Sequence, residues 1–281
     1  MIDGREDRGT DAMSKAPLLP TASISALFTL DRAGFSVDNR VLLEPLSIDL
    51  PARRVIGLIG HNGSGKSTLV KLLARQQAVS TGSISYEGKS LKVWGDRPLA
   101  RKVAYLPQQT PSASGMLVSE LVALGRYPWH GALGRFGPED RRMVEEAMEL
   151  ADVAIYRDRL VDTLSGGERQ RAWLAMLIAQ ETECLLLDEP ISALDVAHQI
   201  EVLTLVRRLA KERRLGVVMV LHDVNMAARF CDEILALHSG RLIAHGPPAQ
   251  IVVPTQLQAI YGIEMGVMRH PDTGIPLAYV R

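Results

Sequence analysis

The sequence predicts an α/β fold: a largely parallel sheet covered on both faces, joined by an antiparallel β subdomain and an inserted α-helical subdomain. Three observations predict it. Residues 55–59 form an apolar run of strand length, followed by a glycine-rich loop and then by residues at helical spacing. The runs 184–188 and 216–221 are almost wholly apolar, which is typical of parallel strands buried on both faces. A helix is expected between them, over residues 197–213, as a parallel connection requires.

The chain before the glycine-rich loop divides into a tail and a β-rich segment. Residues 1–24 are rich in Asp, Arg, Gly, Ser and Pro without periodicity, so we expect a disordered tail, within which Met13 is an alternative translation start. The folded domain then spans residues 25–281. Short β-type runs, broken by Asp38-Asn39 and by Pro51, predict antiparallel strands at residues 27–30, 34–37, 46–50 and 83–86.

The loop Gly60–Thr68 has the pattern Gly-x-x-x-x-Gly-Lys-Ser of a phosphate-binding loop. Its glycines let successive backbone amides point at an anion, and the start of the following helix adds partial positive charge. Lys66 would reach the β- and γ-phosphates of a nucleotide, and Ser67 would offer Mg²⁺ an oxygen ligand. A plain surface turn is disfavoured, because strand, loop, lysine, hydroxyl and helix all follow in order. The predicted phosphate-binding residues are Gly60, His61, Asn62, Gly63, Ser64, Gly65, Lys66, Ser67 and Thr68.

From residue 109 the pattern changes to helical spacing. Helices are expected at residues 118–124 and 138–150 and from near Gly167 through Gln180, so we place a helical subdomain at about residues 109–175. It follows a core strand that Pro107 ends. Near the C-terminus, two short β-type runs predict a hairpin, and a short helix is expected after it, the three segments being residues 234–237, 241–244 and 255–260.

Acidic and histidine side chains end two of the core strands. Asp188 and Glu189 follow one apolar run and His222 follows the next. Open parallel sheets bind ligands at the carboxyl ends of their strands, so we expect these residues beside the phosphate loop. Asp188 would hold Mg²⁺, Glu189 would polarise a water in line with the γ-phosphate, and His222 would contact the same phosphate. In isolation such residues are more often surface or structural features; the phosphate loop favours the catalytic interpretation.

A second helix start carries anion-binding character. In Leu164–Gln170 a serine and two glycines precede a helix, whose first amides can face an anion. Two such helix starts and a single catalytic carboxylate are best explained if the nucleotide lies between two copies of the protein.

Charge balance and cysteine content limit the classes of partner and the cellular compartment that we expect for this protein. Lys+Arg and Asp+Glu are balanced at 32 each, which argues against a broad electrostatic footprint for nucleic acid. Cys184 and Cys231 lie in apolar or helical segments and are expected to be buried and unpaired, as in a reducing compartment. No stretch approaches the roughly 18 to 20 apolar residues of a spanning helix, and no signal peptide is visible. We therefore expect a cytoplasmic protein that contacts a membrane only through a partner.

Six segments resemble, in order and spacing, the complete motif set of an ATP-binding cassette (ABC) transporter ATPase, a family with a RecA-like P-loop NTPase core. They are Gly60–Thr68, Gln108, Leu164–Gln170, Leu185–Glu189, Ser192–Asp195 and His222, and the resemblance covers residues 28–281. It implies binding of ATP and of Mg²⁺, the metal at Ser67, Gln108 and Asp188, and catalysis by Glu189, His222 and Gln108. It also implies a homodimer with Asp195 at its interface. The residues implied to contact ATP held by the other subunit are Leu164, Ser165, Gly166, Gly167 and Gln170.

Two further stretches narrow the resemblance. Residues 125–137, Gly-Arg-Tyr-Pro-Trp-His-Gly-Ala-Leu-Gly-Arg-Phe-Gly, and residues 261–266 resemble the ATPases of ferric hydroxamate (ferrichrome-type) siderophore importers. This implies a membrane permease, a periplasmic or lipoprotein substrate-binding protein acting through it, and a place on the cytoplasmic face of the inner cell membrane. Haem, vitamin B12 and catecholate siderophores stay open as alternative substrates.

The first of these stretches also predicts a docking surface for the permease. It is rich in Gly and Pro and carries aromatic and guanidinium groups of the kind enriched at binding hot spots. The alternative is that Trp129 packs internally and the arginines are only solvated. The residues expected to be exposed for docking are Arg126, Tyr127, Trp129 and Arg135.

The sequence departs from the family's pattern at two positions. The aromatic residue that usually stacks on adenine is replaced by Val37, which leaves open whether Val37 or Phe35, on the same strand face, contacts the base. Ile191 stands where threonine is common, a change expected to be mild. Two rival classes are weaker: a soluble ABC ATPase acting on DNA or ribosomes would usually carry a coiled-coil insertion or a second cassette, and a small-molecule kinase leaves Leu164–Gln170 unexplained.

Overall fold

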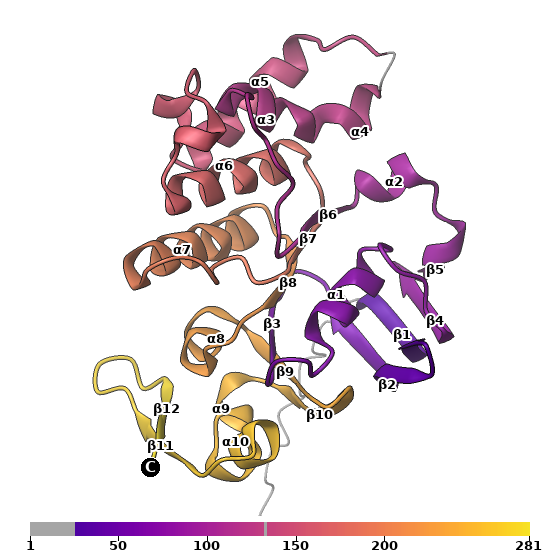
Figure 1. Ribbon diagram of the computed structural model, residues 1–281, viewed down its shortest axis with the longest axis vertical. Coiled ribbons are helices and arrows are strands. Elements are labelled where there is room, and N and C mark those ends of the chain that lie inside the picture. Colours follow the sequence, from indigo (N-terminus) through magenta and orange to yellow (C-terminus); the bar gives the residue numbers. More distant parts are fainter. Residues whose placement is uncertain (1–25, 132–133) are drawn as a thin grey trace, which may run out of the picture.

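The computed structural model describes residues 26–131 and 134–281. The expected tail at residues 1–24, with Met13, lies outside the described residues, as does the pair Ala132-Leu133. At the centre is a six-stranded sheet in the order β10-β9-β3-β8-β7-β6, parallel except for β10, which pairs antiparallel with β9 (Figure 1). Its strands are β3 (Val55–Ile59), β6 (Val103–Leu106), β7 (Cys184–Leu187), β8 (Gly216–Val220), β9 (Glu233–His238) and β10 (Arg241–Gly246).

The central strands are apolar throughout because their side chains alternate between two cores. In β7, Leu185 and Leu187 face one core, whereas Cys184 and Leu186 face the other. Strands β3, β8 and β9 alternate in the same way. Both cysteines are buried and unpaired, as predicted, and burial raises the pKa of the Cys231 thiol to about 12.

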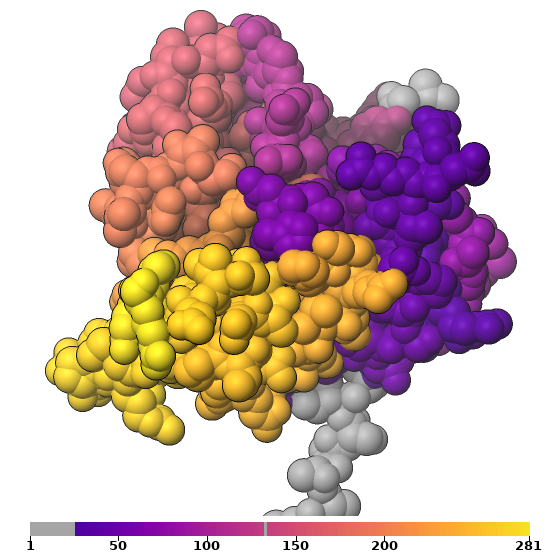
Figure 2. Space-filling model, turned by 60° about the horizontal axis from the view of Figure 1, so that its bottom comes forward, coloured from indigo at the N-terminus to yellow at the C-terminus, as the bar shows by residue number. Residues whose placement is uncertain are grey.

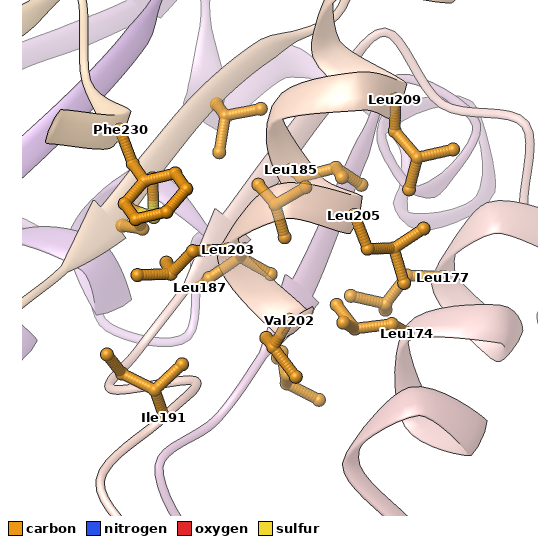
Figure 3. Packing of buried hydrophobic residues seen from close by; sticks show 14 of the residues in the cluster. Leu174, Leu177, Leu185, Leu187, Ile191, Val202, Leu203, Leu205, Leu209 and Phe230 are labelled. Carbon is orange, nitrogen blue, oxygen red and sulfur yellow. The ribbon is translucent and has the colours of Figure 1, made fainter. Parts of the chain in front are cut away.

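Three helices cover the first face of this sheet. Figure 3 shows the leucines of β7 packed against those of the two longest of these helices, with Ile191 in the same core. Ile191 is only 7% exposed, so an apolar side chain suits a position where a polar one is common. The helices are α6 (Gly166–Ala179), α7 (Val196–Glu212) and α8 (Val224–Phe230).

The second face is covered by a helix and by an antiparallel sheet in the order β2-β1-β4-β5. The prediction of separate strands at residues 27–30 and 34–37 is wrong, because one strand spans both runs. Irregular pairing around Ala33 and a left-handed backbone at Arg32 (φ 45°) let that strand continue through polar residues. These elements are α1 (Lys66–Leu73), β1 (Ala26–Val37), β2 (Arg40–Pro51), β4 (Thr81–Tyr86) and β5 (Lys89–Ser90).

A helical layer lies at one end of the central sheet, at the top of Figure 1. It combines α6 with the short α3 and α4 and with α5, which has the predicted bounds. The predicted subdomain boundary near residue 175 falls inside α6, which runs to Ala179. The bounds are α3 (Val118–Ala123), α4 (Tyr127–His130) and α5 (Pro138–Leu150).

The prediction that Arg126 is exposed for docking is wrong. Arg126 is 3% exposed, and its guanidinium forms ion pairs with Asp140 (2.9 Å) and Glu181 (2.6 Å). It also donates a hydrogen bond to the carbonyl of Ala179 at 2.9 Å. Arg126 therefore fastens the start of α5 to the end of α6, a role that sequence alone did not indicate because all three acceptors are distant in the chain.

Trp129 lies partly inside the same cluster. Its ring centroid is 4.9 Å from the guanidinium carbon of Arg101 and 5.0 Å from that of Arg126, and its indole N–H donates to the carbonyl of Gln180 (2.8 Å). It remains 38% exposed. Tyr127 and Arg135 are exposed, so part of the predicted docking surface faces outward.

The C-terminal part adds elements that the periodicity did not reveal. The hairpin β9–β10 and the helix at residues 255–260 were predicted, but a second hairpin, β11–β12, and the short helix α9 were not. No helix among the described residues is long and apolar enough to cross a membrane. The remaining elements are α2 (Asp96–Ala100), α9 (Pro248–Ile251), α10 (Pro254–Tyr261), β11 (Met265–Arg269) and β12 (Pro276–Val280), with 3-10 turns at Leu91–Val93, Leu124–Arg126, Ala154–Tyr156 and Val161–Thr163.

Candidate functional site

A cavity of about 490 Å³ opens at the carboxyl ends of β3, β7 and β8. This is where parallel sheets bind ligands, and it brings together residues that are far apart in the sequence. It is lined by Arg40, Leu42, Asn62, Gly63, Gly65, Lys66, Ser67, Thr68, Gln108, Glu189 and His222.

The phosphate loop is tightly folded against its surroundings. Gly60 has φ 143°, and a Cβ there would lie 2.0 Å from the carbonyl oxygen of Leu237, so only glycine fits. The Lys66 ammonium donates to the carbonyls of Gly60 and His61, both at 2.9 Å, and the residue is 4% exposed. Burial lowers the pKa of Lys66, while the carboxylates of Glu189 and Asp188 oppose this change. The loop thus presents a buried cation at the floor of the cavity.

Ser67 and Asp188 form a donor set suited to Mg²⁺. The Ser67 hydroxyl donates to Asp188 Oδ1 at 2.8 Å, and Asp188 Oδ2 is buried without a hydrogen-bond partner. Burial raises the pKa of Asp188, which the Ser67 hydrogen bond opposes and the charge of Glu189 reinforces. In the described part of the chain no group of three or more His, Cys, Asp or Glu could hold a metal ion. One carboxylate and one hydroxyl fit Mg²⁺, which usually combines few protein ligands with phosphate oxygens and water.

Glu189 is the focus of the polar contacts across the cavity. Its Oε2 accepts a hydrogen bond from Gln108 Nε2 at 2.8 Å and lies 2.8 Å from His222 Nε2. The backbone of Glu189 is left-handed (φ 55°), a conformation that costs energy in a non-glycine residue and is common at functional sites. The structure therefore brings Glu189 and His222 together, as their places after β7 and β8 predicted, and adds Gln108, which only the family resemblance had indicated.

The second helix start lies outside this cavity. None of the residues Leu164–Gln170 lines it, and the same is true of Asp195. Ser165 instead caps α6: its hydroxyl accepts from the amide of Glu168 (3.3 Å), and its own amide donates to the Glu168 carboxylate (2.7 Å). A Cβ on Gly166 would lie 3.5 Å from the side chain of Leu194 and 4.0 Å from the carbonyl oxygen of Ala193, both ordinary contacts. Among the described residues, the hydrogen bonds of the Ser165 hydroxyl and amide are made within this helix start, away from the cavity.

A turn at the end of β9 braces the phosphate loop. The amide of Gly240 donates to the carbonyl of Ser64 (3.1 Å), and the amide of Ser239 donates to His61 Nε2 (3.2 Å). The carbonyl of Gly240 accepts from the amide of Glu44 in β2 (2.8 Å). Figure 2 shows the golden region that contains β9 and β10 against the indigo β1–β2 region. Sequence reasoning missed the brace because its contacts are made by backbone groups, apart from the imidazole of His61.

Sequence reasoning also missed Arg40 and Leu42, which line the cavity. Their positions follow from the turn Asp38-Asn39, because residues 40 and 42 of β2 share one face. Neither candidate for adenine contact lines the cavity: Val37 is 45% exposed, and Phe35 packs against the core that α1 shares with the antiparallel sheet.

Comparison with known proteins places this geometry in a family. The family description "ABC transporter" matches residues 43–192. The iron(3+)-hydroxamate import ATP-binding protein FhuC of Bacillus subtilis is 40% identical over 88% of this chain and 92% of the relative. The ferric enterobactin transport ATP-binding protein FepC of Escherichia coli is 38% identical over 83% and 86%, and the hemin import ATP-binding protein HmuV of Rhodococcus jostii is 38% identical over 94% and 90%.

Solved structures agree with the fold. A chain from an inward-facing ABC transporter, described as being of the metal-chelate type, matches with a TM-score of 0.79 at 25% identity, over 91% of this chain and 96% of that one. An ATP-binding cassette in its ADP conformation, MJ1267, matches with a TM-score of 0.73 over 81% and 94%. At 18% identity the second likeness concerns the fold alone.

Proposed function

Because the chain belongs to the ABC transporter family, we propose that two copies of it hydrolyse ATP at a shared interface and thereby drive a membrane permease that imports iron(III)-hydroxamate siderophores. The observation that carries the ATPase assignment is the cavity at β3, β7 and β8, where a phosphate loop faces one carboxylate held by an amide and an imidazole.

Each side chain of the cavity has a distinct task in hydrolysis. Lys66 and the loop amides bind the β- and γ-phosphates, since both present positive charge to the same space. Glu189 accepts a proton from the attacking water, and Gln108 and His222 orient its carboxylate. Ser67 and Asp188, with the carbonyl oxygen of Gln108, would hold Mg²⁺, which neutralises charge on the phosphates.

A homodimer is supported because one subunit supplies only one side of the proposed nucleotide site. The cavity supplies one side of a phosphate site, while Leu164–Gln170 presents a capped helix start that does not line this cavity. If two copies face each other, the helix start of one covers the cavity of the other. Leu164, Ser165, Gly166, Gly167 and Gln170 then contact the nucleotide, with Asp195 at the interface.

The identity of the imported substrate is the more specific part of the proposal. The hydroxamate importer FhuC is 40% identical to this chain, but relatives of haem and catecholate systems are nearly as similar. The stretch at residues 125–137 supports hydroxamate. Haem import is the second candidate, supported by HmuV of Rhodococcus jostii, which matches 94% of this chain. The ATPase would lie on the cytoplasmic face of the membrane, bound to a permease that receives its cargo from a substrate-binding protein.

Uptake measurements in the native host test this proposal. Cells lacking this chain should lose uptake of iron-loaded hydroxamate and keep uptake of haem and of iron-loaded catecholate. The unaltered chain should restore uptake and Glu189→Gln should not. Loss of haem uptake instead would transfer the assignment to the second candidate, and unchanged uptake of all three would contradict an importer role for this chain.

A further inference from the structure

We propose that Arg40 is the platform on which the nucleobase of ATP stacks, its planar guanidinium taking the place of the aromatic ring that the chain lacks. This inference rests on the proposed ATP site. It assigns a base-contacting role to a residue that neither the motifs nor the family resemblance indicated.

The position of Arg40 follows from a tight turn. Asp38 and Asn39 both have left-handed backbones, at φ 47° and 62°, and connect β1 to β2 in two residues. Val37 and Arg40 are therefore directly paired, and paired residues of antiparallel strands project from the same face. Arg40 and Leu42 share that face by strand alternation, and both line the cavity.

The distance from the phosphate loop suits a nucleoside. The carbonyl of Leu42 directly abuts the loop, since a Cβ on Gly65 would lie 2.8 Å from it. Arg40 is two residues farther along β2, or about 7 Å at the rise of a strand. A nucleotide whose phosphates are held by Lys66 must extend its sugar and base away from the loop, and Arg40, which follows the strand away from the contact of Leu42 with the loop, lines the same cavity.

The chemistry of the surroundings leaves the guanidinium available. Arg40 is exposed, and the first acidic residue along β2, Glu44, is paired with Arg241 at 3.9 Å. Val37 is small and 45% exposed, so it does not cover its paired neighbour. A guanidinium is planar, delocalised and weakly hydrated, and it stacks on flat aromatic systems in a way that an ammonium does not. Leu42 would supply apolar contact beside it.

Binding measurements with two ligands separate a base contact from a phosphate contact. The affinity of the full chain is measured for a non-hydrolysable ATP analogue and for inorganic tripolyphosphate, both with Mg²⁺. Arg40→Lys keeps the charge and loses the plane, so it should weaken analogue binding roughly three- to tenfold and leave tripolyphosphate binding within about twofold. Arg40→Trp should recover analogue binding, because it restores a flat surface without charge. Arg214→Lys, an exposed arginine beyond α7, is the matched control and should change neither affinity.

Two outcomes would overturn the inference. Unchanged analogue affinity in Arg40→Lys would show that the base lies elsewhere, and equal weakening for both ligands would show that Arg40 contacts phosphate. If the unaltered protein binds neither ligand, the ATP site itself is refuted, which is a failure of the proposed function and is distinguished by that control.

Discussion

Glu189 and Lys66 line the same cavity, but substitutions at the two positions should affect different steps, hydrolysis at Glu189 and nucleotide binding at Lys66. In Glu189→Gln the new amide can still meet Gln108 and His222, so ATP should bind while water activation is lost. Turnover should fall on the order of a hundredfold or more, as expected when a catalytic base is removed.

Lys66→Ala should instead weaken nucleotide binding, because it removes the buried cation. Parallel measurements of turnover and analogue affinity check this, and near-normal hydrolysis in Glu189→Gln would remove Glu189 from its assigned role.

The contribution of Asp140 to the free energy of unfolding should depend on pH. Burial favours its neutral form, but the amide of Gly137 and the guanidinium of Arg126 outweigh burial and lower its pKa. A carboxylate with a lowered folded-state pKa contributes stability above its unfolded pKa of about 3.9, and that stability is lost as the pH falls through the folded value. Asp140→Asn should therefore cost about 2 kcal/mol of unfolding free energy at pH 7, and this difference from the parent should shrink below about pH 4.

Urea unfolding of both proteins between pH 7 and pH 3 measures that difference. Glu139→Gln is the matched control, because Glu139 forms an exposed pair with Arg142 that should contribute little. A deficit for Asp140→Asn that stays constant with pH would show that the charge of Asp140 is not what stabilises the helical layer.

At the scale of elements, the β9–β10 turn should set the shape of the phosphate loop. Gly240→Ala introduces a Cβ 3.1 Å from the carbonyl of Leu42 at a backbone with φ 79°, which should disturb the hydrogen bonds to Ser64 and Glu44. Gly88→Ala is the matched control: its φ is 76°, and nothing lies within 4 Å of the new atom. Both changes should lower thermal stability, since both place a side chain in the left-handed region at a cost of about 1 kcal/mol, and Gly240→Ala should lower it further because it also disturbs these hydrogen bonds.

Only Gly240→Ala should also weaken ATP-analogue binding, by roughly tenfold, the equivalent of one good hydrogen bond. Equal analogue affinities in the two variants would mean that the loop keeps its shape without the brace.

At the scale of the whole molecule, fewer residues of the predicted docking surface are exposed than the sequence indicated. Tyr127 and Arg135 are exposed, whereas Arg126 is buried and Trp129 is partly packed. Tyr127→Ala with Arg135→Ala should leave basal ATPase of the isolated protein within roughly threefold, because neither residue contacts the cavity, yet abolish uptake and co-purification with the permease. Surviving uptake in this double variant would place the docking surface elsewhere.

The contacts that could not be predicted from the sequence all depend on residues that are distant in the chain, whereas the predictable elements depend on local patterns. Strand alternation and helix periodicity are local, so the central strands, α5 and α7 were predictable, and the phosphate loop was recognisable from contiguous residues. Arg126 was misplaced because its burial depends on acceptors in α5 and beyond α6. Arg40 and the Gly240 brace were missed because their roles arise only when β2 lies beside the loop.

The central claim is that each ATP is held between the phosphate loop of one copy and the α6 start of the other. Size-exclusion chromatography with light scattering tests it on Glu189→Gln, which should bind ATP with Mg²⁺ and form a dimer of twice the 30.8 kDa chain mass. Gly166→Ala in the same background is accommodated within the chain, since its new Cβ would make only ordinary contacts, with Leu194 at 3.5 Å and the carbonyl oxygen of Ala193 at 4.0 Å. The added methyl group should nevertheless block close approach of the phosphate held by the partner. That double variant should bind ATP and stay monomeric. A monomer in Glu189→Gln with ATP bound, or a dimer of undiminished stability in the double variant, would contradict the shared site.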